Sequence, residues 1–491
     1  MNASNTYWNL KVIFIATFVG IINSFCYLNF TIMIALCALE VILLMLAYIR
    51  RNYVQYVCLY MIFLTFSMES DNFVGGEDFY GFKNFRILGV NLATWMLMPL
   101  LFDALRKLRS ISDNLEGLHL IIFKRLTFFT LCGSLMGAIV YMLDDYGFRS
   151  KEGSLKEFVN SYYSFYIPYI TIFVISWIVI TNKSSVYKIK QYLFACIPAT
   201  AIVFILCLIL GNYGNRAGSD SLQVSEIYFL LIGSLILISF NEFTIIEKSV
   251  ILFSGCVIAS LSIFYNASGK ILIIMMLTPV LWLIVLYKQG IRLKIYHYLI
   301  LFVLILYLPD LLGLIMGVEN NTLSSKLDDV TGLLNFFFLG DGLMLIPGSP
   351  QMRITEFMNV GYEYIVHPWY AFFGKGFAGS IKDLLNLFPE LDEAAFPEWQ
   401  LQLGAYHGLH ESFNLFFLIG GFSGLYILFN SIYQILKRMN YSAWLVIGGM
   451  WFFLFYGYHM NVSIYGITAL VIGLNEITIK ECKSPQKSKS M

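Results

Sequence analysis

The sequence predicts an all-α polytopic membrane protein with about 14 transmembrane helices and one large loop on the outer face. Of the 491 residues, 58% are hydrophobic and only 13% are charged, whereas charged residues make up about a quarter of soluble proteins. The mean hydropathy is +0.71. Apolar runs of roughly 16 to 26 residues, long enough to cross a bilayer, recur along the chain. Lipid offers the backbone no hydrogen bonds, so these runs are expected to be helical.

The expected spans and the positions of the basic residues give an orientation. Placing the N-terminus inside puts most of the 32 Lys and Arg residues on inner loops, which is the bias of membrane proteins. Both termini are therefore predicted to be inside and the long loop outside. The spans are expected near residues 8–27, 29–49, 53–68, 87–105, 126–143, 161–181, 192–211, 227–245, 249–265, 271–287, 297–316, 410–435, 442–457 and 460–478.

These spans divide the chain into four parts. Residues 1–316 hold the first eleven helices, 317–409 form the large outer loop with short helices, 410–480 hold three more helices, and 481–491 are a basic inner tail. Seven of the eight cysteines fall inside apolar runs, so no disulfide framework or metal set is expected. The net charge of +1 gives no indication of a nucleic-acid partner.

The outer loop carries the first candidate residues. Residues 353–366 are expected to form a helix that ends before Pro368, because proline disfavours helix at the residue before it. Arg353 would then lie at a helix N-terminus, where backbone N–H groups and the guanidinium favour an anion. A simple ion pair with Glu356 is the alternative. Residues 380–399 are rich in acidic side chains and are expected to form a solvent-facing stretch over the site.

His410 is the candidate for proton transfer. It stands at the head of a predicted span, where it can orient or deprotonate an acceptor hydroxyl, or serve only as an interfacial cap. Glu411 follows it directly, and which of the two side chains is the base stays open. Gly421 and Gly424, further along the same span, are expected to allow close helix packing rather than to bind a ligand.

Three more basic residues are candidates for binding an anionic group on the outer side. Arg216 lies in a short glycine-rich loop whose backbone can approach a ligand closely. Lys270 lies at the outer mouth of a span, where a snorkelling anchor is the alternative. Arg86 follows an acidic stretch between two spans. No Walker motif or other glycine-rich phosphate loop occurs on the inner side, so nothing there indicates use of a nucleotide.

The order of motifs from 353 to 424 resembles the signature of the bacterial O-antigen polymerase and O-antigen ligase superfamily. In that family an arginine opens a helix of the large periplasmic loop, a His-Pro and a Gly-x-Gly-x-Phe follow, and a histidine begins the next span. Asn215-Arg-Ala-Gly218 resembles the family's outer-loop arginine segment, and Asn266-Ala-Ser-Gly-Lys270 its Ser-Arg-Gly segment with lysine in place of arginine. The matching residues here are Arg353, Gly361, His367-Pro368, Gly374-Lys-Gly376-Phe377, His410-Glu411 and Gly421-x-x-Gly424.

The resemblance implies a fold, an activity and a location. It implies a GT-C-like inverting glycosyltransferase in the bacterial inner membrane, which needs no metal or cofactor and takes undecaprenyl-diphosphate-linked oligosaccharides as donor and acceptor. A chain-length regulator protein is an expected partner. The predicted catalytic residues are His410, Glu411 and Arg353, and the predicted donor diphosphate-binding residues are Arg216, Arg353, Lys270 and Arg86.

Three functions remain open at this point. A polymerase that joins lipid-linked repeat units on the periplasmic face is favoured, because ligases of the family usually carry Asn, Ser or Gln where this chain has Glu411. The alternative is a ligase that transfers the glycan to a lipid A core. A flippase for the same lipid is disfavoured, because charged residues are scarce in mid-span and no two matching halves with broken helices are present.

Overall fold

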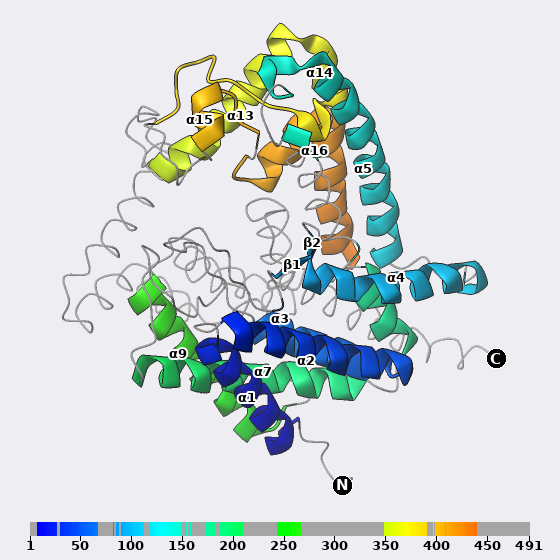
Figure 1. Cartoon of the computed structure of the whole chain (residues 1–491), viewed down its shortest axis with the longest axis vertical. Helices are drawn as coiled ribbons and strands as arrows, with labels where there is room; N and C mark the ends of the chain where they lie inside the picture. The colour runs from blue at the N-terminus through cyan, green and yellow to red at the C-terminus, as the bar shows by residue number, and fades with distance from the viewer. Residues whose placement is uncertain are drawn as a thin grey trace, which may run out of the picture. The chain divides into compact units, whose positions relative to one another are not determined.

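A computed structural model of the chain describes about half of its residues, and the described part is mostly helical (Figure 1). The chain divides into two compact units. The first comprises residues 1–123, 167–266 and 461–491, and the second comprises 124–166 and 267–460. The described residues are 7–26, 30–66, 82, 85–87, 90–111, 118–149, 154–155, 158, 170, 173–182, 186–209, 243–266, 348–389, 396, 398–407 and 409–438.

Three helices of the described part are long and apolar enough to cross a membrane. The segments are Lys124–Leu143 in α5 (Leu118–Leu143), Val186–Leu206 in α7 (Val186–Ile209) and Phe413–Ser431 in α16 (Ser412–Arg438). These segments coincide with three of the predicted spans. The prediction of apolar helices long enough to cross a membrane is confirmed for these three segments. The predicted spans near 271–287, 297–316, 442–457 and 460–478, and most of 161–181 and 227–245, lie outside the described residues.

Helices of the first unit also follow the predicted runs. They are α1 (Leu10–Cys26), α2 (Phe30–Ile49), α3 (Tyr53–Phe66), α4 (Leu92–Ile111), α7 and α9 (Ile245–Asn266). α1 packs mainly against α7, where Val12, Ile13 and Ala195 form a small core. At the N-terminal side of α1, the Trp8 backbone N–H donates to Glu247 Oε1 at 2.9 Å, so α9 is tied to the same group of helices.

The span predicted near 87–105 begins later than expected. Strands β1 (Arg86–Ile87) and β2 (Val90–Asn91) form a short antiparallel pair in which Arg86 faces Asn91, and α4 starts only at Leu92. The Tyr60 hydroxyl donates to the Ala93 carbonyl at 3.0 Å and so holds the start of α4 against α3.

The second unit contains α5, the short helix η1 (Asp145–Gly147), α13 (Gly348–Val366), α14 (Pro368–Phe373), η4 (Gly376–Ala378), α15 (Glu398–Leu403) and α16. α5 and α16 run side by side in opposite directions (Figure 1). At one end Arg125 Nη1 donates to Asn430 Oδ1 at 2.8 Å. Further along, a Cβ placed on Gly133 would lie 2.8 Å from the Ile419 side chain, so the two helices touch closely there.

A break at Gly421 divides α16 into two helical pieces. Gly421 has φ 58° and ψ −147°, a backbone conformation that side-chain-bearing residues rarely adopt. The chain bends so sharply that a Cβ on Gly424 would lie 2.2 Å from the Phe416 carbonyl oxygen. A Cβ on Gly421 would lie 2.3 Å from the Ala371 carbonyl oxygen in α14. Both glycines therefore serve close packing, as predicted, although the predicted span is not one straight helix.

Candidate functional site

The helix that carries Arg353 starts earlier than the sequence predicted. α13 begins at Gly348 and includes Pro350 in its first turn, where proline is tolerated because the first N–H groups have no helical partner. It ends at Val366, directly before His367-Pro368, as predicted. Arg353 consequently lies in the second turn, so its side chain, rather than the amides of a helix N-terminus, is what this part of α13 offers to an anion.

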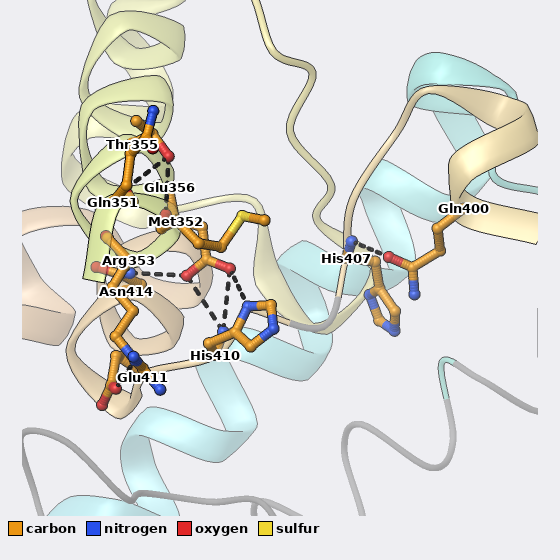
Figure 2. Close-up of polar contacts among 10 residues, drawn as sticks. All are labelled: Gln351, Met352, Arg353, Thr355, Glu356, Gln400, His407, His410, Glu411 and Asn414. Atoms are coloured by element: carbon orange, nitrogen blue, oxygen red, sulfur yellow. Dashed lines mark hydrogen bonds and ion pairs between the residues drawn. The ribbon is translucent and has the colours of Figure 1, made fainter. Parts of the chain in front are cut away.

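His410 and Glu356 form the centre of the site (Figure 2). His410 Nδ1 lies 2.6 Å from Glu356 Oε1, and the His410 backbone N–H lies 3.2 Å from each oxygen of the same carboxylate. Asn414 Nδ2, from the first turn of α16, donates to Glu356 Oε2 at 2.8 Å and to the Arg353 carbonyl at 2.9 Å. Glu356 is fully buried, while the His410 side chain keeps 28% of its surface exposed. The carboxylate thus joins α13 to the start of α16.

This geometry assigns different roles to the two imidazole nitrogens. A carboxylate only accepts hydrogen bonds, so the His410 Nδ1 carries the proton in the bond to Glu356. In the neutral ring the other nitrogen, Nε2, is then an acceptor. The same arrangement of a buried carboxylate behind a histidine fixes the tautomer and orientation of the general base in Ser-His-Asp hydrolases. The pair can therefore remove a proton from a hydroxyl group placed at Nε2.

Arg353 is paired with Glu411, and Glu356 is paired with His410. Arg353 Nε contacts Glu411 Oε1, and the two side chains are 26% and 8% exposed. All four residues therefore converge from two turns of α13 and the start of α16 (Figure 2). Sequence reasoning considered Glu356 only as a partner of Arg353, because the two lie three residues apart on one helix. The contact between Glu356 and His410 joins residues 54 positions apart.

Aromatic packing holds the histidine ring in place. The Phe396 ring meets the His410 ring edge-on, with 5.1 Å between centroids. His407 is buried against Phe148 at 5.0 Å, and its backbone N–H donates to Gln400 Oε1 at 2.9 Å (Figure 2). His407 therefore supports the chain that leads to His410, and its contacts indicate a structural role.

A second polar cluster, which sequence reasoning left out of the site, lies around Lys375. This lysine has no exposed surface, and its ammonium group donates to Glu363 Oε1 at 2.8 Å and to the Ser380 carbonyl at 2.9 Å. The Tyr146 hydroxyl donates to Glu363 Oε2 at 2.6 Å, and the Tyr146 ring lies 4.4 Å from the lysine Nζ. The sequence feature that indicates this cluster is the position of Lys375 between Gly374 and Gly376. Two glycines at this spacing indicate a turn whose backbone packs closely against neighbouring helices.

We expect Glu363→Gln to destabilise the protein by about 3–5 kcal/mol, because it leaves the fully buried Lys375 ammonium without its counter-charge. Thermal unfolding in detergent, followed by circular dichroism, measures the loss. The double variant Glu363→Gln, Lys375→Met is the matched control and should recover much of the stability, since it removes both charges. Equal stability of wild type and Glu363→Gln would show that the ion pair is not needed.

The acidic stretch predicted for 380–399 is partly engaged within the protein. Asp383 accepts hydrogen bonds from Asn359 Nδ2 and from the backbone N–H groups of Leu387 and Phe388, each at 3.0 Å. Its carboxylate therefore closes a turn against α13 and does not face solvent freely. Burial, and to a smaller extent the charge of Asp383, raises the pKa of the Tyr406 phenol. Residues 390–395 lie outside the described part.

The remaining predicted binding residues are not brought to this cluster by the described structure. Arg216 and Lys270 lie outside the described residues, and Arg86 belongs to β1 of the first unit. Their approach to Arg353 stays a prediction. Among the residues that the structure describes, no group of three or more His, Cys, Asp or Glu side chains is arranged to hold a metal ion.

Comparison of the chain with protein-family models, curated proteins and solved structures found no match. The resemblance between residues 353–424 and the O-antigen polymerases and ligases therefore rests on the motifs alone.

Proposed function

We propose that the protein is a GT-C-type membrane glycosyltransferase with about 14 spans that polymerises undecaprenyl-diphosphate-linked oligosaccharide repeat units on the periplasmic face of the bacterial inner membrane. The observation that carries this proposal is the His410–Glu356 pair beside Arg353, at the start of a helix long and apolar enough to cross a membrane. A base and a cation at that position suit a substrate whose lipid lies in the membrane and whose sugar lies outside it.

The proposed reaction uses His410 as the base. Nε2 takes the proton of the acceptor hydroxyl while the oxygen of that hydroxyl attacks the anomeric carbon of the donor sugar. The bond between that carbon and the diphosphate oxygen breaks, and its electron pair leaves with the lipid diphosphate. Attack from the face opposite the departing group inverts the anomeric centre. The lipid diphosphate supplies the activation, so the reaction needs no nucleotide.

Arg353 is proposed to bind the departing diphosphate. A guanidinium presents donors in a fixed planar fork that matches phosphate oxygens, and its partly exposed position leaves it accessible to a ligand. Glu411 holds the side chain from the buried side, so we assign Glu411 to positioning Arg353, with His410 as the base. Arg216, Lys270 and Arg86 are proposed as further diphosphate ligands.

The direct test is a reaction with purified protein and a lipid-linked repeat unit that serves as both donor and acceptor. A ladder of extended glycans on the lipid, seen by gel electrophoresis and mass spectrometry, is the expected result. Product formed only when a lipid A core acceptor is added would assign the ligase instead. Transfer of the intact lipid across vesicles without a new glycosidic bond would assign a flippase.

Arg353→Lys should lower the rate of chain extension about 100- to 1,000-fold, because lysine keeps the charge but loses the two-pronged geometry at the leaving group. Rates are measured on the purified variant at matched protein amounts. Glu411→Gln is the matched control, since it keeps the guanidinium and removes only the group that positions it, and it should cost less. Wild-type rates for Arg353→Lys would exclude bidentate binding of the diphosphate.

A further inference from the structure

The segment after α14 packs on the middle of an apolar helix. A Cβ on Gly376 would lie 2.0 Å from the backbone nitrogen of Gly137, and a Cβ on Gly133 would lie 3.0 Å from the Phe377 ring. Both α5 glycines belong to Lys124–Leu143, one of the segments long and apolar enough to span a membrane. At a rise of about 1.5 Å per residue, they lie about 9 and 15 Å from the Leu143 end. Residues 376–378 thus lie between about a third and a half of the way along this segment from its Leu143 end.

Phe372 and Phe373 are fixed at the same level because the residues on both sides of them contact the bend of α16. The Ala371 carbonyl oxygen lies against Gly421, and a Cβ on Gly374 would lie 2.2 Å from the Ile419 carbonyl oxygen. The neighbouring Gly420 packs on the Phe129 ring of α5, where an added Cβ would lie 2.3 Å from a ring carbon. These contacts hold Phe372 and Phe373 close to α5.

The aromatic side chains at this level face outward. Phe372 is 66% exposed and Phe373 is 64% exposed, and Trp369 on the same short helix is exposed too. Between residues 357 and 373 the only Asp, Glu, Lys or Arg is Glu363, which is buried and paired with Lys375. The segment therefore presents an apolar surface without an exposed charge.

We propose that residues 368–378 re-enter the membrane from the outer side and that Phe372 and Phe373 contact lipid acyl chains there. The sequence placed the whole of 317–409 outside; this proposal puts one part of that loop at the depth of the hydrocarbon. The proposal is independent of the chemistry at His410, because it rests on the apolar length of α5, on the contacts of residues 376–378 with α5 and on the contacts of Ala371 and Gly374 with α16.

Backbone hydrogen bonds at the non-helical part of this segment fit the requirement that lipid imposes. Non-helical backbone is tolerated at membrane depth only where the protein itself satisfies its polar groups. The Gly374 N–H donates to the Tyr370 carbonyl at 2.8 Å, the Lys375 N–H to the Leu418 carbonyl at 2.7 Å, and the Gly379 N–H to the Gly376 carbonyl at 3.1 Å. The helix start at Pro368 lacks an N–H altogether.

The charge at this depth is also compensated. Ionisable residues inside a membrane face the protein interior and pair with one another. Lys375 does both, since it is fully buried and bonded to Glu363. Lipid, rather than a second protein, is the favoured occupant of the outer surface, because α5 itself exposes Leu131, Leu135 and Ile139 at the same level. These three side chains lie on the face of α5 opposite Gly133 and Gly137, so apolar side chains are exposed on both sides of the packed pair at this depth.

The test measures what surrounds a nitroxide spin label at residue 372. Phe372→Cys is made in the full-length chain with its eight native cysteines replaced, labelled, and reconstituted in phospholipid vesicles. Collision rates with oxygen, which concentrates in the bilayer, and with a nickel chelate, which stays in water, are measured by electron paramagnetic resonance. Leu135→Cys, in the middle of α5 and 66% exposed, is the lipid control, and Gln402→Cys, exposed on α15, is the water control.

The label at 372 should match the one at 135, with frequent oxygen collisions and few nickel collisions. A profile like that at 402 would place the segment in water, and protection from both reagents would mean that protein covers it; either result overturns the proposal. If the cysteine-free chain does not assemble, benzoylphenylalanine at 372 in the otherwise native chain replaces the label. Photo-crosslinking to phospholipid would support the proposal, and crosslinking to a polypeptide would contradict it.

Discussion

His410→Ala should lower the rate of glycan chain extension by about 100- to 10,000-fold, the typical effect of losing a positioned general base. The loss follows from the removal of Nε2, the nitrogen that faces away from Glu356. The measurement is the initial rate of product formation from the lipid-linked repeat unit by purified protein. Binding of the same lipid should be nearly unchanged, because the diphosphate is proposed to bind Arg353.

His410→Asn separates the chemistry from the structure. Its amide nitrogen can still donate to the buried Glu356 carboxylate, so the contact between α13 and α16 is kept while the base is absent. This variant should be folded and as slow as His410→Ala. Gln402→Ala, on the exposed side of α15, is the control and should keep the wild-type rate. Undiminished extension by His410→Asn would remove His410 from the mechanism.

Glu356→Gln should also reduce the rate strongly, by about 100- to 10,000-fold, because an amide does not hold the imidazole in the tautomer that leaves Nε2 free to accept a proton. Glu356 is a positioning residue, since the buried carboxylate touches His410 and not the substrate. The effect should therefore appear in kcat, with KM for the lipid-linked donor nearly unchanged.

Glu356→Asp distinguishes this role from simple support of the fold. Aspartate keeps the charge at a shorter reach, so it should restore part of kcat. Asn414→Ala removes another hydrogen-bond partner of Glu356 and leaves the contact with His410, so it should lower thermal stability more than kcat. If Glu356→Gln and Asn414→Ala lose activity only in proportion to their folded fraction, the carboxylate is structural.

The helices could be predicted from the sequence where a local physical cause decides them. The apolar run in α5 is long enough to span a membrane, and the end of α13 before Pro368 follows from the steric effect of proline on the preceding residue. The late start of α4 could not be predicted in this way. Hydropathy does not distinguish the residues of a short antiparallel pair at 86–91 from the first turn of an apolar helix.

The partners within the site were less predictable than its members. His410, Arg353 and Glu411 were found from their motifs, but the spacing of Arg353 and Glu356 on one helix favoured a local pair. The observed pairing depends on how α13 docks on α16, which is a tertiary contact between distant parts of the chain. The break at Gly421 is similar, because a glycine permits a positive φ without requiring it.

The short connection before α16 makes chain length itself a determinant of the site. Tyr406 is fixed by a two-way backbone pairing with Ile381, at 2.8 and 2.9 Å, and the helix begins at Ser412. Only residues 407–411 join these two fixed points. One inserted residue adds about 3.8 Å of chain, more than the 2.6 Å between His410 Nδ1 and Glu356 Oε1. The number of residues between Tyr406 and Ser412 is therefore as important to the site as the identity of His410 within this connection.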